Sequence, residues 1–105
     1  MELFATHYET EALIPMDLVQ KIKKSATFHE GMATLRQLSF AFLDMAWHGS
    51  NPTTVTDVKA FEKKAFKGTT LYPDTIETCM STAFSHIFQG GYAAGYYSYL
   101  SLIHI

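Results

Sequence analysis

The stretch of sequence that organises this chain reads Phe84-Ser85-His86-Ile87-Phe88-Gln89-Gly90-Gly91-Tyr92-Ala93-Ala94-Gly95-Tyr96-Tyr97-Ser98-Tyr99. It places four tyrosines, three glycines and one histidine within sixteen residues. The pair Gly90-Gly91 predicts a break in regular structure, because glycine loses more backbone entropy on folding than a helix former does. A final helix is therefore expected to begin near Ala93. Gly95 leaves room for another group to approach the backbone closely.

Three of the four tyrosines have helical spacing. Tyr92, Tyr96 and Tyr99 stand at i, i+4 and i+7, which share one face of a helix, whereas Tyr97 is expected to point elsewhere. A phenol combines a flat apolar ring with a hydroxyl that donates a hydrogen bond. Such a row of phenols is suited to binding a peptide. Its hydroxyls are also suited to donating hydrogen bonds to an oxygen that gains negative charge during a reaction. The same spacing is typical of a tyrosine-rich helix that packs on its neighbours, and spacing alone leaves both possibilities open.

The composition indicates one small globular domain. The chain has 105 residues, of which 48% are hydrophobic and 17% are charged, and its formal net charge is −2. This composition is too apolar for a disordered chain, and it lacks the basic excess that indicates nucleic acid or an anionic membrane. A single cysteine, Cys79, excludes an internal disulfide and favours a small buried residue over a catalytic thiol. No apolar run approaches the length of a membrane span.

The first half of the chain predicts two helices after an irregular or partly helical lead-in at residues 1–14. Pro15 and Asp17 suit the start of the first helix, and Leu18, Val19 and Ile22 supply its buried side. A long helix is expected from Thr27 or Phe28 to a cap at His48-Gly49. Its apolar stripe recurs every three or four residues and consists of Phe28, Met32, Leu35, Leu38, Phe42 and Met45.

The second half predicts shorter helices between turns. Residues 50–54 form a turn, and Thr56 is expected to cap a helix that stops at Gly68 and buries Val58, Phe61 and Ala65. A short helix is expected from about Asp74 to Phe88, before the glycine pair. No segment alternates with a period of two, so the sequence predicts an all-α fold of several amphipathic helices, with a Gly/Tyr-rich loop leading into the last helix.

A zinc motif is absent from the sequence. Residues 29–33 begin like the motif H-E-x-x-H, but Ala33 stands where the second histidine would be needed to hold zinc on one helical face. The motif occurs nowhere else in the chain. The histidines are scattered, and we expect each of them except His86 to be a surface, capping or packing residue. The chain itself is therefore expected to bind no metal.

The segment from His86 to Leu100 resembles the signature of the thimet oligopeptidase and peptidyl-dipeptidase (dipeptidyl carboxypeptidase) family of zinc metallopeptidases. The match covers about residues 3 to 100 and is closest to the peptidyl-dipeptidase branch. It implies part of a zincin-type catalytic domain that hydrolyses oligopeptides. The upstream segments that carry it are Phe4–Thr10, Ile14–Met16, Lys21–Ser25, Thr34–Phe40 and Leu43–His48.

The resemblance also implies roles for single residues. Tyr99 would donate to the tetrahedral oxyanion, and Tyr92 and His86 would bind substrate and assist at the same centre. A glycine-rich loop would close on the peptide. The implied substrate-binding set is His86, Gly90, Gly91, Tyr92, Gly95, Tyr96 and Tyr99.

Because the zinc motif is missing, the resemblance implies a fragment that is inactive alone, with the zinc of the parent enzyme bound by residues outside this chain. Residues 1–100 would be the C-terminal part of the catalytic domain. Residues 101–105 would be a truncated or non-native tail, since family members continue with tryptophan and an acidic helix. The implied partners are an oligopeptide substrate and the rest of the catalytic domain, with no nucleic acid and no membrane.

Two further expectations remain. The parent is expected to be cytoplasmic, with no signal peptide visible because the N-terminus looks truncated. The alternative to a peptidase fragment is a non-catalytic helical module whose tyrosine-rich helix binds another protein. That module would use the same tyrosines without a metal.

Overall fold

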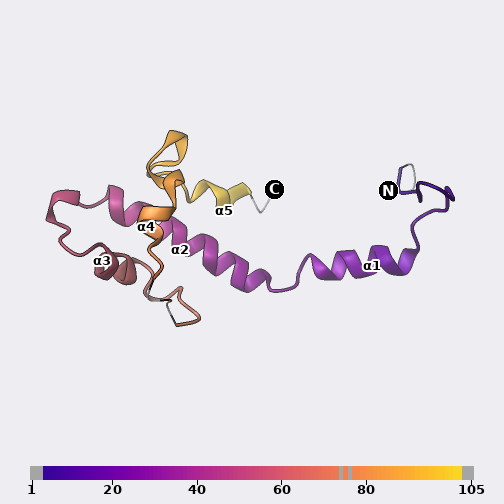
Figure 1. The fold of residues 1–105 in the computed structure, drawn as a ribbon, viewed down its shortest axis with the longest axis horizontal. Helices are drawn as coiled ribbons and strands as arrows, with labels where there is room; N and C mark the ends of the chain where they lie inside the picture. The colour runs from indigo at the N-terminus through magenta and orange to yellow at the C-terminus, as the bar shows by residue number, and fades with distance from the viewer. Residues whose placement is uncertain (1–3, 74, 76, 103–105) are drawn as a thin grey trace. The chain divides into compact units, whose positions relative to one another are not determined.

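The computed structural model describes residues 4–73, 75 and 77–102. The chain divides into two compact units, residues 1–30 and residues 31–105. Every regular element in the described residues is a helix, and extended pairing is limited there to one isolated bridge between Thr6 and Leu13 (Figure 1). The prediction of an all-α fold is thus confirmed. In the described part of the chain, no helix has the length and apolar character needed to cross a membrane.

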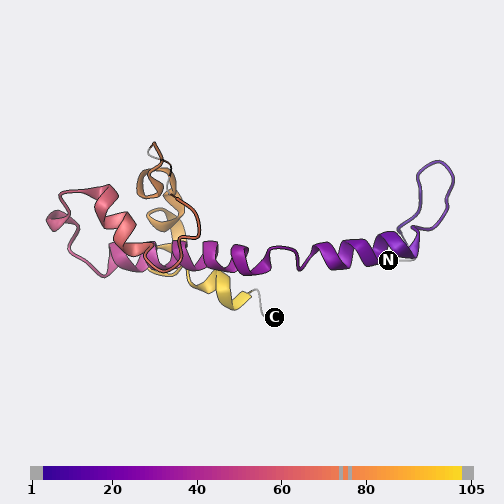
Figure 2. The ribbon, with the colours of Figure 1, turned by 90° about the horizontal axis from the view of Figure 1, so that it is seen from below.

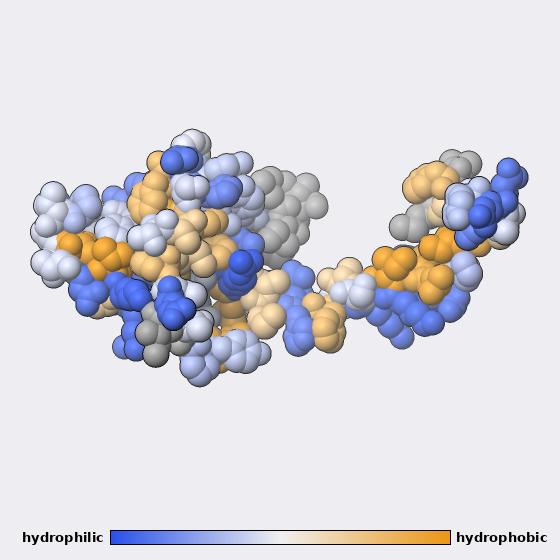
Figure 3. Space-filling view, in the orientation of Figure 1, coloured by the Kyte–Doolittle hydropathy of each residue, from blue (hydrophilic) through white to orange (hydrophobic). Residues whose placement is uncertain are grey.

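The first unit contains an irregular lead-in and the helix α1 (Met16–Ser25). Asp17 in its first turn pairs with Lys21 at 3.2 Å. Val19 is the buried residue of α1, whereas Leu18 and Ile22, expected to be buried with it, are exposed. The apolar side chains of α1 gather along one edge and the hydrophilic ones along the other (Figure 3). The helix is therefore amphipathic, as predicted.

The long helix α2 (Glu30–His48) ends where the sequence predicts, but begins two to three residues later. His29 has φ +57°, in the left-handed region that interrupts a right-handed helix. The predicted apolar stripe is not the buried face: Met32, Phe42 and Met45 are exposed, and so is Phe28 in the first unit. The buried face carries Phe40, Ala41, Leu43 and Asp44, because the C-terminal segment covers that side of the helix.

A turn with a short 3-10 helix (Pro52–Thr54) leads to α3 (Val58–Ala65). The prediction that Thr56 caps α3 is wrong by one residue. Asp57 is the N-cap, and its carboxylate accepts a hydrogen bond from the Ala60 N–H at 3.0 Å. The helix packs on α2 through the Phe61 ring, whose centre lies 4.4 Å from that of Trp47.

The predicted helix over 74–88 is much shorter in the structure, and residues 74 and 76 lie outside the described residues. It is replaced by α4 (Met80–Ala83) and a 3-10 turn (Ser85–Ile87), because Phe84, with φ −102° and ψ 80°, leaves the helical region. A second 3-10 turn (Gly90–Tyr92) follows. The last helix, α5 (Ser98–Leu102), begins five residues later than expected and includes the first two residues of the predicted tail.

The core of the second unit lies where the segment from α4 to α5 crosses the C-terminal half of α2 (Figures 1 and 2). Leu43 and Ile87 are fully buried there. The Phe40 and Phe84 rings stack with centres 4.7 Å apart. The tyrosine-rich segment thus belongs to the core through Tyr96, and its position is set by α2.

Candidate functional site

Three phenol rings form one cluster, which we call the phenol cluster: Tyr92, Tyr96 and Tyr99. The Tyr99 ring lies 4.7 Å from that of Tyr96 and 5.1 Å from that of Tyr92, between ring centres. Tyr97 is 58% exposed and stands apart from these contacts. The grouping predicted from the sequence is therefore present.

The reason for this grouping differs from the prediction. The three tyrosines do not share one helix: Tyr92 ends a 3-10 turn, Tyr96 lies in the following turn, and Tyr99 belongs to α5. Successive tight turns bring them together. The N–H of Gly95 donates to the carbonyl of Tyr92 at 2.9 Å, and the N–H of Tyr99 donates to the carbonyl of Tyr96 at 3.1 Å. These i to i+3 bonds replace the expected continuous helix.

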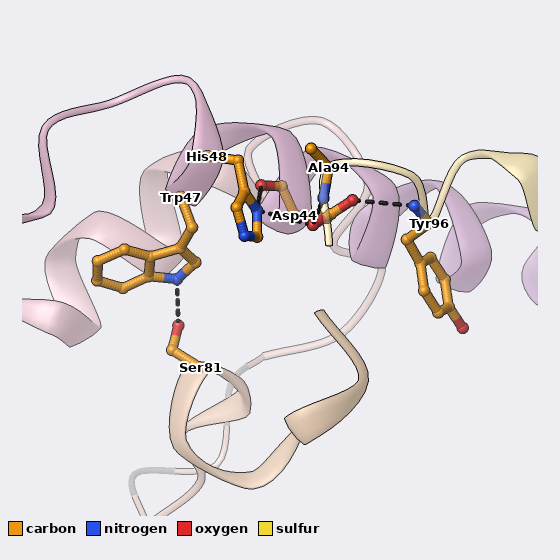
Figure 4. A network of polar contacts seen from close by, with 6 residues as sticks. All are labelled: Asp44, Trp47, His48, Ser81, Ala94 and Tyr96. Atoms are coloured by element: carbon orange, nitrogen blue, oxygen red, sulfur yellow. Dashed lines mark hydrogen bonds and ion pairs between the residues drawn. The ribbon is translucent and has the colours of Figure 1, made fainter. Parts of the chain in front are cut away.

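A buried carboxylate of α2 holds the loop between Tyr92 and Tyr96. Asp44 is fully buried; its Oδ1 accepts the Ala94 N–H and its Oδ2 accepts the Tyr96 N–H, each at 2.9 Å. His48 Nδ1 lies 2.9 Å from both Asp44 Oδ1 and the Asp44 carbonyl oxygen. Figure 4 shows this carboxylate between the helix and the loop. Both carboxylate oxygens are therefore occupied by the chain itself.

Tyr96 is fixed at both ends. Its backbone N–H binds Asp44, and its hydroxyl donates to Gln37 Oε1 at 3.1 Å. Its ring is buried against Phe40 and Phe84. Burial raises the pKa of the Tyr96 phenol, and the charge of Arg36 opposes that rise. The Tyr96 hydroxyl is thus engaged within the chain.

Tyr99 and Tyr92 are the more accessible members of the cluster. Tyr92 is 40% exposed and Tyr99 is half-buried. A hydrogen bond with the Tyr92 phenol, followed by burial and the neighbouring phenols Tyr92 and Tyr96, raises the pKa of Tyr99. Like any tyrosine, Tyr99 keeps its proton at neutral pH, so its hydroxyl can donate a hydrogen bond there.

His86 contacts the phenol cluster only indirectly, through Phe84. It lies in the 3-10 turn before the glycine pair, and its imidazole is exposed. The ring stacks on Phe84, with centres 5.2 Å apart and planes 25° from parallel. Phe84 in turn contacts the Tyr96 ring at 5.2 Å. The structure therefore connects His86 to the phenol cluster through one shared aromatic neighbour.

The three glycines of the predicted loop differ in their backbones. Gly90 has φ +80°, a conformation that side chains rarely adopt. At Gly91 an added Cβ would meet open space, and at Gly95 it would meet ordinary contacts of 3.7 Å with the carbonyl oxygens of Gly91 and Tyr92. Among these three positions, backbone geometry therefore favours glycine at Gly90 alone.

A second carboxylate, which the sequence analysis also missed, fastens the start of α4. Glu62 accepts the N–H of Met80 at 2.9 Å and both the N–H and the hydroxyl of Ser81 at 2.6 and 2.7 Å. The Trp47 indole N–H donates to the Ser81 hydroxyl at 3.1 Å (Figure 4). The Cys79 thiol donates to the same carboxylate at 3.7 Å.

The charge on Glu62 is stabilised by these contacts. Burial alone would raise its pKa, but the hydrogen bonds from Met80, Ser81 and Cys79 outweigh burial and lower it. The carboxylate is thus held in its charged form as a structural cap between α3 and α4.

The described residues offer no set of ligands for zinc. Nowhere in the described ranges do three or more histidine, cysteine, aspartate or glutamate side chains gather as a metal site. His29, which opens the false zinc motif, packs its ring against Phe28 instead.

Comparison with known proteins identifies relatives over most of the chain. The sequence profile described as Peptidase family M3 matches residues 1–103. Dipeptidyl carboxypeptidase of Escherichia coli K12 is 39% identical over 99 residues, which cover 92% of this chain and 14% of that protein. Organellar oligopeptidase A of Arabidopsis thaliana is 39% identical over 99 residues, covering 90% of this chain and 12% of that protein. No solved structure matches.

A further Arabidopsis relative, named probable cytosolic oligopeptidase A, is 38% identical over 96 residues, covering 90% of this chain and 14% of that protein. The chain therefore spans a small fraction of the length of the curated relatives that it matches. The two plant relatives carry the names of different compartments, so the expected cytoplasmic location stays a prediction.

Proposed function

Because this chain belongs to peptidase family M3, we propose that it is the substrate-binding and oxyanion-stabilising part of an enzyme that hydrolyses oligopeptides. The observation that carries this proposal is the phenol cluster, in which the half-buried Tyr99 lies against the accessible Tyr92. Family membership favours this role over the non-catalytic interaction module that the sequence left open.

Peptide hydrolysis places negative charge on the oxygen of the scissile carbonyl. A preorganised donor stabilises that charge without reorganising at the moment of reaction. Two features support this role for Tyr99: a phenol keeps its proton at neutral pH, and the Tyr99 ring is held between two others. We assign Tyr99 the donor role, and Tyr92 and His86 the binding of the peptide beside it.

The glycine-rich loop would close on the bound peptide by a movement at Gly90 and Gly91, since Asp44 holds the loop further on, at Ala94. Gly90 and Gly91 are exposed, and an added Cβ at either position would meet open space. Such a loop can move relative to the fixed Tyr96 and shield the scissile bond from water. Gly95 and Tyr96 complete the proposed substrate-binding set.

Zinc, which the family resemblance implies, would be held by residues outside this chain, since the described residues do not form a ligand set for it. When bound, it would polarise the carbonyl and activate water. We therefore propose that the isolated 105-residue chain is inactive.

The test is Tyr99→Phe in the complete peptidase that carries this segment. The change keeps the ring and its packing and removes only the donor. Loss of one oxyanion donor typically lowers kcat by ~10²–10³, or about 2.7–4 kcal/mol. The value of KM should change little, because the lost bond is made mainly in the transition state.

Tyr97→Phe is the matched control, since it removes the phenol of an exposed neighbour that lies outside the cluster. It should leave kcat near the wild-type value, and metal content should be equal in all variants. If Tyr99→Phe keeps kcat within a few-fold while Tyr97→Phe abolishes it, the donor has been assigned to the wrong tyrosine.

A further inference from the structure

We infer that Asp44 is a positioning residue for peptide hydrolysis: from α2 it holds the loop of residues 92–96 so that Tyr99 meets the substrate oxygen. This inference rests on the function proposed above. Asp44 touches neither substrate nor reacting atoms in this scheme and acts entirely through the phenol cluster.

The first argument is the burial of a charged group. Asp44 has no exposed surface, and its two oxygens accept backbone N–H groups from residues 50 and 52 positions further along the chain. An ionised carboxylate is costly to bury unless its lone pairs are used, and an apolar residue would fill the same space at lower cost. What Asp44 supplies that an apolar residue cannot is a fixed geometry for the loop.

The second argument is the backbone of Ala94. Its φ of +56° lies in the left-handed region, where the Cβ of an alanine is crowded and the backbone is strained. The Ala94 N–H donates directly to Asp44 Oδ1, so the carboxylate stabilises the strained turn. That turn reverses the chain between Tyr92 and Tyr96 and lets the Tyr92 ring return against Tyr99.

The third argument is the path from Asp44 to Tyr99. The carboxylate fixes the Tyr96 N–H, and the Tyr96 carbonyl accepts the N–H of Tyr99 at 3.1 Å. The two rings are also in contact, with centres 4.7 Å apart. A shift of Tyr96 therefore moves Tyr99. His48 keeps the carboxylate in its rotamer through the contact at Oδ1.

The test is Asp44→Asn in the complete peptidase. Asparagine has the same size but offers one carbonyl oxygen and one NH₂ group, so one of the two loop N–H groups would face another donor. A misplacement of about 1 Å can lower the rate ~10²-fold. We expect kcat to fall by about 10- to 100-fold, with KM changed less than about threefold.

A double-mutant cycle separates positioning from general damage. If Asp44 acts through Tyr99, the Asp44→Asn/Tyr99→Phe double variant should be no slower than Tyr99→Phe alone. Losses that simply add would overturn the inference, and so would wild-type kcat in Asp44→Asn. If Tyr99→Phe itself retains wild-type turnover, the proposed function fails, and the inference falls with it.

Glu62→Gln is the matched control, because it alters another carboxylate that receives backbone N–H groups from a distant segment. It should weaken the attachment of α4 and keep kcat near wild type. Hydrogen exchange should become faster in a different segment in each variant. Residues 92–96 should exchange faster in Asp44→Asn, and residues 79–82 should exchange faster in Glu62→Gln. Equal kcat losses in both variants would overturn the inference.

Should Asp44→Asn fail to fold, His48→Phe provides the second variant. It keeps an aromatic ring and removes the Nδ1 contacts to the carboxylate and to the carbonyl oxygen of Asp44. We expect a smaller loss of kcat than in Asp44→Asn. In the Tyr99→Phe background, His48→Phe should cause no further loss. A loss of the same size in both backgrounds would overturn the inference.

Discussion

At the scale of single residues, the loop of residues 92–96 contains one alanine with a strained backbone next to one with an unstrained backbone. Ala94 has φ +56°, whereas Ala93, with φ −60° and ψ 124°, is in an ordinary extended conformation. Glycine relieves strain only at the first of these positions, because it has no Cβ to clash there. At the second it only adds freedom to the unfolded chain.

We therefore predict opposite effects from two alanine-to-glycine changes. Ala94→Gly should stabilise the folded conformation of the loop of residues 92–96 by up to about 1 kcal/mol. Ala93→Gly should destabilise that conformation by about 0.5–1 kcal/mol. Hydrogen exchange of residues 92–99 measures the opening free energy directly. Slower exchange in the first variant and faster in the second is the expected result; equal effects would mean that Ala94 is not strained in solution.

Among the residues of the candidate site, the tyrosines were predictable from the sequence, whereas the two carboxylates were not. Helical spacing placed Tyr92, Tyr96 and Tyr99 together and set Tyr97 apart, although the helix behind that argument is absent. Asp44 and Glu62 were missed because their partners lie 50 and 18 residues away, beyond any local pattern. The one local signal was an aspartate on the core face of α2, four residues before a histidine.

At the scale of elements, the attachment of α4 depends on the charge of one glutamate. The pKa of Glu62 is lowered in the folded chain, so its stabilising contribution is complete above the ordinary value for glutamate of about 4.3. The contribution is lost as the pH falls through the lowered pKa of the folded state. Protonation weakens the carboxylate as acceptor for Ser81, which is also the partner of Trp47.

Trp47 is the only tryptophan of the chain and can report this transition. We predict that its fluorescence stays constant on acidification until the pH is below the ordinary glutamate pKa, and then changes as α4 loosens. Glu62→Gln should lack this transition, since it has no proton to gain. A wild-type midpoint at or above the ordinary value would contradict the lowered pKa.

Element boundaries were predicted well where a local signal dominates. The C-terminus of α2 at His48 follows from the cap at His48-Gly49, whereas α3 ends at Ala65, three residues before the stop predicted at Gly68. The starts of α2 and α5 were predicted too early, because His29 and Ala94 adopt left-handed backbones that no composition rule assigns to them. The buried face of α2 was predicted wrongly, since tertiary contacts of Gln37 and Asp44 decide it.

At the scale of the whole molecule, an apolar surface of α2 is left without cover from the described residues of its unit. Met32, Phe42 and Met45 are 42%, 49% and 48% exposed. Exposed apolar groups on one helix favour association. We predict that the isolated chain is helical by circular dichroism, unfolds with weak cooperativity and sediments as concentration-dependent oligomers.

Phe42→Gln should reduce that association without disturbing the loop, because the Phe42 side chain points away from the core that contains Phe40 and Leu43. Sedimentation velocity over a range of concentrations compares the two proteins. A clean wild-type monomer with a sharp melting transition would show that the chain is a self-sufficient domain.

The long separation between Asp44 and its loop partners also fixes an order of events in folding. The α2 backbone bonds are local and form within about a microsecond, whereas the bonds to Ala94 and Tyr96 close loops of 50 and 52 residues. The phenol cluster is thus assembled after α2, the helix that carries Asp44. Molecules can therefore reach nearly full helix content while still lacking a competent site, and ellipticity recovered on refolding overstates the fraction that is ready to act.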